Sequence, residues 1–191
     1  RNISYGSHGQ WNLLDVYYPK GTSDALPTIV SIHGGGYVYG SKEVYQFYAA
    51  NLAEKGFAVI NYNYRLAPKY KFPAPLQDLS LVIDWILAHQ EEYPLDPDRV
   101  FIVGDSAGAQ IASQYGAIYS NPEYEKIMGI AKPPITLRAL GLCCGTYDLK
   151  KGISEAKGRG LLREYLTGNP FQFGKMLDVQ STMKCQKYMI I

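Results

Sequence analysis

The stretch that decides the fold is "RVFIVGDSAGAQIA", residues 99–112. Residues 99–104 form an apolar run typical of a strand buried on both faces of a parallel sheet, and residues 107–120 have a helical pattern. The chain must therefore turn sharply at Ser106, which lies between Gly104 and Gly108. This is the G-x-S-x-G arrangement of a nucleophile elbow, in which the serine hydroxyl stands above the carboxyl edge of the sheet. The alternative is a glycine-rich turn in which Ser106 is an ordinary helix N-cap.

A second glycine motif, "HGGGYVYG" (33–40), follows the apolar run "PTIVSI" (27–32) directly. Three consecutive glycines cost backbone entropy, and that cost is understandable if bare backbone must present N–H groups to a ligand. We predict that Gly34 and Gly35, together with Ala107 at the start of the helix, donate to the oxyanion of a tetrahedral intermediate. Losing one such donor typically costs roughly 3 kcal/mol of transition-state stabilisation. A merely flexible loop fits poorly, because the motif follows a buried strand.

Strand-like and helix-like segments alternate along the chain. The strand-like segments are 12–19, 27–36, 57–64, 99–104 and 137–145, and the helix-like segments are 42–55, 74–93 and 107–120. This alternation predicts an α/β fold with a mostly parallel sheet and helices on both faces, in one domain spanning 1–191 with its core in 10–150. Residues 158–168 predict one further short helix.

The predicted helix 42–55 has the spacing of an amphipathic helix, and Gly56 follows it as a C-cap. The apolar residues at this spacing are Val44, Phe47, Tyr48 and Leu52.

Composition excludes several classes of protein. A formal net charge of +2 with 19% charged residues offers no polybasic arm for nucleic acid. No apolar run reaches the length of about 18 residues that a membrane span needs. Cys143, Cys144 and Cys185 show no zinc-ligand spacing, and neighbouring cysteines on a strand point to opposite faces, so we expect reduced thiols and a cytoplasmic protein. The chain starts at Arg1 rather than Met, so a signal peptide removed earlier, and hence secretion, stays open.

Three motifs together resemble the hormone-sensitive-lipase-like group of α/β-hydrolase carboxylesterases: "HGGGYVYG", "NYNYRLAPKYKFPAPLQD" (61–78) and "GDSAGAQIA" (104–112). The resemblance covers about residues 10–150. It implies hydrolysis of short-chain acyl esters through an acyl-serine intermediate at Ser106, without metal or cofactor. It also implies that His33 braces the glycine loop and that Arg65 and Asp78 hold the loop and helix start of 61–78 in place.

The resemblance assigns the same oxyanion donors, Gly34, Gly35 and Ala107. The leading interpretation is a carboxylesterase for small acyl groups such as acetyl, acting on a small-molecule ester. Residues 150–175 are expected to form a partial cap, and Tyr37, Tyr39 and Tyr147 to line the pocket. An amide hydrolase, either a formamidase or a serine peptidase, would use the same two glycine motifs.

The base that would activate Ser106 cannot be identified in this sequence. The triad of α/β-hydrolases follows the order Ser, acid, His, yet His8, His33 and His89 all precede Ser106. Neither Asp148 nor Asp178 is assigned as the acid. We therefore expect the α/β-hydrolase fold to be incomplete at its C-terminus, with the acid and histidine in further sequence. A true fragment without a base, or an inactive protein that binds acyl compounds, are the alternatives. An exposed sheet edge would then favour a homodimer or aggregation.

Overall fold

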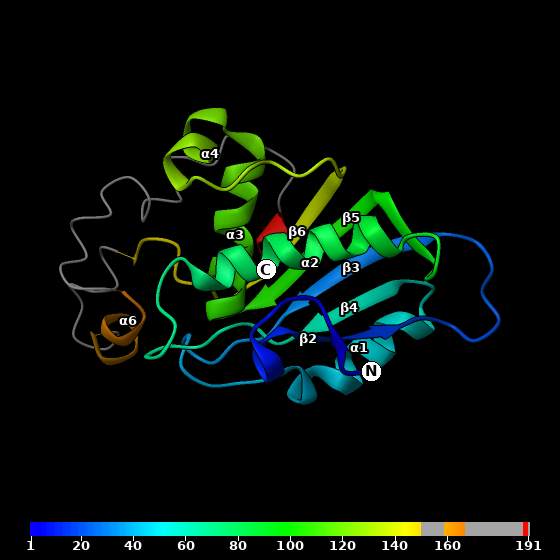
Figure 1. Ribbon diagram of the computed structural model, residues 1–191, viewed down its shortest axis with the longest axis horizontal. Helices are drawn as coiled ribbons and strands as arrows, with labels where there is room; N and C mark the ends of the chain where they lie inside the picture. Colours follow the sequence, from blue (N-terminus) through cyan, green and yellow to red (C-terminus); the bar gives the residue numbers. More distant parts are fainter. Residues whose placement is uncertain (150–158, 167–188, 191) are drawn as a thin grey trace.

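The computed structural model describes residues 1–149, 159–166 and 189–190 (Figure 1). Within them the chain forms a seven-stranded sheet in the order β1-β2-β4-β3-β5-β6-β7. The strands are β1 (Ile3–Ser4), β2 (Leu13–Tyr17), β3 (Leu26–Ile32), β4 (Ala58–Tyr62), β5 (Leu95–Asp105), β6 (Leu137–Cys143) and β7 (Met189–Ile190). The β1–β2 and β2–β4 pairs are antiparallel and the other pairs are parallel. The predicted mostly parallel sheet is confirmed.

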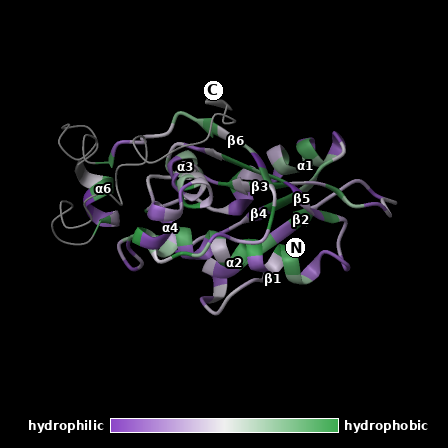
Figure 2. Cartoon of the chain, turned by 90° about the horizontal axis from the view of Figure 1, so that it is seen from above, coloured by the Kyte–Doolittle hydropathy of each residue, from purple (hydrophilic) through white to green (hydrophobic). Residues whose placement is uncertain are grey.

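The helices lie on both faces of this sheet, as predicted. They are α1 (Gln46–Glu54), α2 (Ala74–His89), α3 (Ala107–Ser120), α4 (Pro122–Met128) and α6 (Arg159–Tyr165), with short 3-10 helices η1 (Gly9–Asn12) and η2 (Lys42–Tyr45). Figure 2 shows α1 on one side of the strands and α2 on the other. The third helix, α3, contacts α2, β5 and β6, so the larger part of the core lies on the α2 and α3 side.

The two faces are packed differently. On the α2 and α3 face, Ile83, Ile86 and Ile111 are fully buried. On the other face, α1 packs against the sheet through Ala49 and Ala53, which cluster with Ile29 and Val59. The predicted apolar stripe of 42–55 points largely outward: exposed fractions are 71% for Val44, 79% for Phe47 and 48% for Tyr48, while Leu52 is half-buried. Small residues at 49 and 53 let the helix approach closely, and the larger ones stay at its rim.

Several predicted boundaries hold and some shift. α3 begins and ends at the predicted residues 107 and 120. β5 begins earlier than predicted, at Leu95, because Leu95 and Asp96 pair with the start of β3 before the register shifts. Helix α4 was not predicted, although Asn121 caps it by accepting from the Glu123 and Tyr124 amides and Gly129 ends it at φ 63°. α6 lies within the predicted helix 158–168, of which residues 158, 167 and 168 fall outside the described part.

The two neighbouring cysteines do not share a strand, contrary to the sequence argument. β6 ends at Cys143, and Cys144 adopts φ 53° beyond it. Both are exposed and free. Among the described residues, every helix is too short or too polar to cross a membrane.

Candidate active site

Ser106 occupies a strained turn between β5 and α3. Its backbone has φ 50° and ψ −116°, its side chain is exposed, and its amide donates to the Cys143 carbonyl at 2.8 Å. A Cβ added to Gly104 would lie 2.4 Å from the Gly108 carbonyl carbon, and one added to Gly108 would lie 2.2 Å from the Ile32 oxygen. Both glycines are therefore required by close backbone contact. The Ser106 side chain makes no capping hydrogen bond, contrary to the N-cap interpretation, and its backbone has the strain that a nucleophile elbow would require.

His33 braces the glycine loop, as the resemblance implied. It is 1% exposed, its ring stacks on Tyr64 with centroids 4.1 Å apart, and Tyr64 Oη donates to its carbonyl at 3.0 Å. His33 Nδ1 lies 2.7 Å from the Gly34 carbonyl oxygen, which can only accept, so Nδ1 carries the proton. Burial lowers the pKa of His33 to about 4, and the ring is neutral at pH 7.

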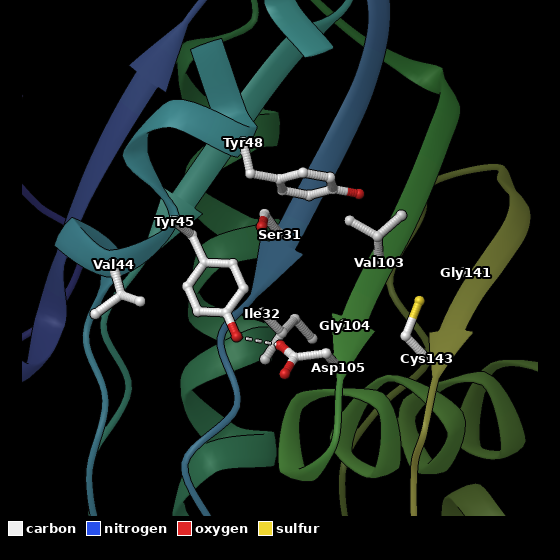
Figure 3. Close-up of a pocket in the computed structure, with 10 residues that line it drawn as sticks. All are labelled: Ser31, Ile32, Val44, Tyr45, Tyr48, Val103, Gly104, Asp105, Gly141 and Cys143. Carbon is white, nitrogen blue, oxygen red and sulfur yellow. Dashed lines mark hydrogen bonds between the residues drawn. The ribbon is translucent and has the colours of Figure 1, made fainter. Parts of the chain in front are cut away.

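The glycine loop and the elbow touch each other directly. A Cβ on Gly34 would lie 2.6 Å from Asp105 Oδ2. The Gly34 amide donates to Tyr45 Oη at 3.3 Å, and that hydroxyl donates to Asp105 Oδ1 at 2.5 Å (Figure 3). The Gly34 amide thus has a protein partner, contrary to the expectation that it faces the oxyanion. Gly35 and Ala107 stay as the predicted donors.

Gly35 shows why this loop needs glycine. It has φ 119°, and a Cβ there would lie 2.0 Å from the Tyr39 oxygen. The amides of Val38 and Tyr39 both donate to the Gly35 carbonyl at 3.1 Å. The loop is therefore a tight, hydrogen-bonded turn rather than a flexible segment.

The three tyrosines predicted to line a pocket have different environments. Tyr37 is 4% exposed, stacks on Tyr165 of α6 at 3.9 Å between centroids, and donates to Gln110 Oε1 at 3.2 Å. It has almost no surface left to offer a substrate. Tyr39 is 63% exposed, and Tyr147 is half-buried beyond β6. The three do not form one wall.

α6 packs over the glycine loop, in the region predicted to act as a partial cap. A Cβ on Gly36 would lie 2.5 Å from Leu161 Cδ1, and the Phe72 amide donates to the Tyr165 carbonyl at 2.9 Å. The remainder of the predicted cap 150–175 lies outside the described residues.

Arg65 and Asp78 hold the loop and the helix start in place, as the resemblance implied, and they do so by pairing with each other. Arg65 Nε lies 2.8 Å from Asp78 Oδ1, the Arg65 amide donates to Oδ2 at 2.7 Å, and Asn12 Nδ2 donates to Oδ1 at 3.2 Å. Burial raises the pKa of Asp78, and the contacts with Arg65 partly offset that rise. This pair joins the loop after β4 to α2, away from the elbow.

The histidines other than His33 also have partners elsewhere. His89 stacks on Trp85 with centroids 4.3 Å apart, and its Nδ1 lies 2.8 Å from the Trp85 carbonyl oxygen. His8 packs edge-on against Tyr70. Of the two acids left unassigned, Asp148 follows β6 and Asp178 lies outside the described residues. Within the described ranges, no group of three or more His, Cys, Asp or Glu residues could hold a metal ion.

A cavity of about 440 Å³ opens beside the junction of loop and elbow, on the α1 side of the sheet (Figure 3). Its apolar lining includes Val44, Tyr48, Val103 and Cys143, and the Tyr45–Asp105 hydrogen bond forms one end of it. Tyr45 was not identified from the sequence, because nothing in its segment separates it from the sixteen other tyrosines.

Known proteins are similar to this chain in sequence and in fold. Residues 14–151 match the BD-FAE family. Arylacetamide deacetylase of Bos taurus is 40% identical over 104 residues, covering 51% of this chain and 26% of that protein. A probable carboxylic ester hydrolase of Mycobacterium tuberculosis, LipM, is 29% identical over 153 residues, covering 78% of this chain and 35% of that protein.

The solved structure of an inhibited esterase B from Lactobacillus rhamnosis superposes with a TM-score of 0.87 at 26% identity, covering 99% of this chain and 64% of that one. The chain thus spans about a quarter to a third of the curated relatives named above. Because the family model matches residues 14–151, more than half of the chain, the chain belongs to the BD-FAE family of α/β-hydrolases.

Proposed function

We propose that this chain carries the nucleophile and oxyanion donors of a serine carboxylesterase that hydrolyses small, acetyl-like esters. The observation that supports the proposal best is Ser106 itself. Its side chain is exposed on a strained turn at the N-terminus of α3, beside the glycine loop. Relatives named as carboxylic ester hydrolases support the same reaction class.

In this reaction Ser106 Oγ bonds to the acyl carbon while its proton passes to a general base. The resulting oxyanion accepts hydrogen bonds from the amides of Gly35 and Ala107. Collapse of the tetrahedral intermediate expels the alcohol, which takes the proton, and water then releases the acid from the acyl-serine. Because the three histidines are held by other residues, the base and its acid partner are expected in sequence beyond this chain.

The nucleophile is tested by p-nitrophenyl acetate hydrolysis, with the 191-residue chain and the complete gene product side by side. Ser106→Ala is expected to reduce kcat in the complete product by about a thousandfold or more. Ser120→Ala, at the far end of the same helix, is the matched control and should retain activity. A fluorophosphonate probe should label the unmodified protein and not Ser106→Ala. Equal rates for the unmodified protein and Ser106→Ala would show that the esterase proposal is wrong.

Amide hydrolysis is the second candidate, because a relative at 40% identity carries the name arylacetamide deacetylase. A p-nitroacetanilide assay beside the ester assay separates the two. If the protein instead binds acyl compounds without hydrolysing them, the complete product should turn over neither substrate.

We also propose a cytoplasmic location and association with a second copy of the chain. Reduced Cys143 and Cys144 suit a cytoplasmic location. Among the described residues, β7 is the outer neighbour of β6, which it meets at Gly141 and Leu142, and we propose that a second copy would pair at this end of the sheet.

A further inference from the structure

We propose that Tyr45 is a positioning residue that sets the distance between the glycine loop and the nucleophile elbow. The inference rests on the proposed function. Tyr45 ends η2, and its side chain reaches across to the carboxyl ends of β3 and β5 (Figure 3). Its hydroxyl touches Gly34, the first residue of the loop, and Asp105, the residue just before Ser106.

The chemistry of the three groups fixes the direction of both hydrogen bonds. The Asp105 carboxylate can only accept, so the Tyr45 hydroxyl donates to it, and at 2.5 Å the bond has the length of a charge-assisted one. The lone pairs of the same oxygen then accept from the Gly34 amide at 3.3 Å. Turning the hydroxyl hydrogen toward Gly34 would set two donors against each other there and leave two acceptors, the Tyr45 oxygen and the carboxylate, facing each other at Asp105. The Tyr45 oxygen therefore has one arrangement available.

This arrangement persists at working pH. Burial, followed by the hydrogen bond to Asp105, raises the pKa of Tyr45 to about 12. The hydroxyl thus keeps its proton throughout the range in which esterases are assayed. The loop's other side is fixed independently, because His33 Nδ1 donates to the Gly34 carbonyl. The amide and the carbonyl oxygen of Gly34 are thus both held. The Tyr45 hydroxyl links Gly34 to Asp105 of the elbow, and a separate hydrogen bond links Tyr37 of the same loop to Gln110 of α3.

The spacing matters because the oxyanion donors come from both sides of this junction. Gly35 belongs to the loop and Ala107 to the elbow. Without a Cβ, Gly34 can approach Asp105 closely, as the 2.6 Å distance from its hypothetical Cβ to Oδ2 shows. Misplacement of a catalytic group by about 1 Å can cost about a hundredfold in rate.

The main test is Tyr45→Phe, which removes the hydroxyl and keeps the ring. We expect kcat for p-nitrophenyl acetate in the complete product to fall about ten- to a hundredfold, with KM within about twofold of the unmodified value. In the ¹⁵N-labelled 191-residue chain, exchange of the Gly34 amide hydrogen should accelerate by about tenfold or more. Tyr48→Phe is the matched control: it lines the same cavity, and its hydroxyl lies toward Val103 rather than Asp105 (Figure 3). It should change neither quantity.

Asp105→Ala tests the same contact from its other end. Because both changes remove the hydrogen bond between Tyr45 and Asp105, the double variant should be about as slow as the slower single variant, whereas independent effects would multiply. The inference is overturned if Tyr45→Phe matches Tyr48→Phe in kcat, if Gly34 exchange is unchanged, or if the two effects multiply. If the unmodified complete product is as inactive as Ser106→Ala, the esterase proposal fails; Tyr45 then has no reaction to position, and Gly34 exchange shows separately whether it holds the loop.

Discussion

The junction of the glycine loop with the elbow and the outer surface of α1 border the same cavity but follow opposite packing rules. At the junction, Gly34, Gly104 and Gly108 approach neighbouring atoms so closely that a Cβ fits at none of them. On η2 and α1, Val44 and Phe47 keep 71% and 79% of their surfaces exposed. Both regions have clear sequence patterns. The junction is packed so that its backbones touch, whereas the apolar side chains on the outer surface of α1 are exposed to solvent.

The difference shows what each pattern reports. A glycine required at a turn reports a close contact, because only the absence of a side chain permits the approach. An apolar stripe reports only that a helix has an apolar side, and does not identify what covers it. The junction can therefore be expected to tolerate almost no change, and the outer surface of α1 to tolerate many.

The largest effect is expected for Gly108→Ala. The new Cβ would lie 2.2 Å from the Ile32 oxygen and 2.8 Å from the His33 oxygen, and both are backbone atoms of the sheet and loop that cannot rotate away. We expect the free energy of unfolding, measured with urea, to fall by more than about 3 kcal/mol. Gly160→Ala is the control, because nothing lies within 4 Å of its added Cβ and alanine favours the helix. A mild Gly108→Ala would mean that α3 can move away from β3.

The parts of the fold that could be predicted from the sequence are those set by local pattern. The apolar run 99–104, the glycines around Ser106 and the period of 107–120 located β5, the elbow and α3 with few errors. The short helix α4 was missed although Asn121 and Gly129 are typical start and stop residues, because its seven residues are too few to show a period.

The site was only partly predictable, because several of its contacts join residues on different elements of the fold. The sharp turn at Ser106 follows from local sequence and the bracing role of His33 from the family resemblance, whereas the partner of the Gly34 amide is Tyr45, eleven residues away and on another element. Tyr37 was expected at a pocket wall, but its stacking on Tyr165 depends on where α6 packs. Spacing along the chain carries no information about either contact.

A smaller effect should appear as a pH dependence of stability from His33. Its pKa is about 4 when folded and about 6.5 when unfolded, so between these values the unfolded chain binds more protons. The contribution is complete above pH 6.5, is lost as the pH falls toward 4, and amounts to about 3 kcal/mol. Urea unfolding between pH 7 and 4.5 measures it. His33→Asn should flatten this slope; parallel curves for the two proteins would show that His33 is not buried neutral.

The smallest effect is expected for Phe47→Ser, on the exposed outer surface of α1. Because the ring is 79% exposed, its loss should change the free energy of unfolding by less than about 0.5 kcal/mol. The matched control is Phe72→Ser, whose ring is 5% exposed and packs edge-on against Tyr165, and there the loss should be about 3 kcal/mol or more. If Phe47→Ser were as damaging as Phe72→Ser, the outer surface of α1 would have to be covered in solution. Covering by a second copy would make the effect depend on protein concentration, because dilution removes the partner, whereas covering by further sequence of the same protein would not.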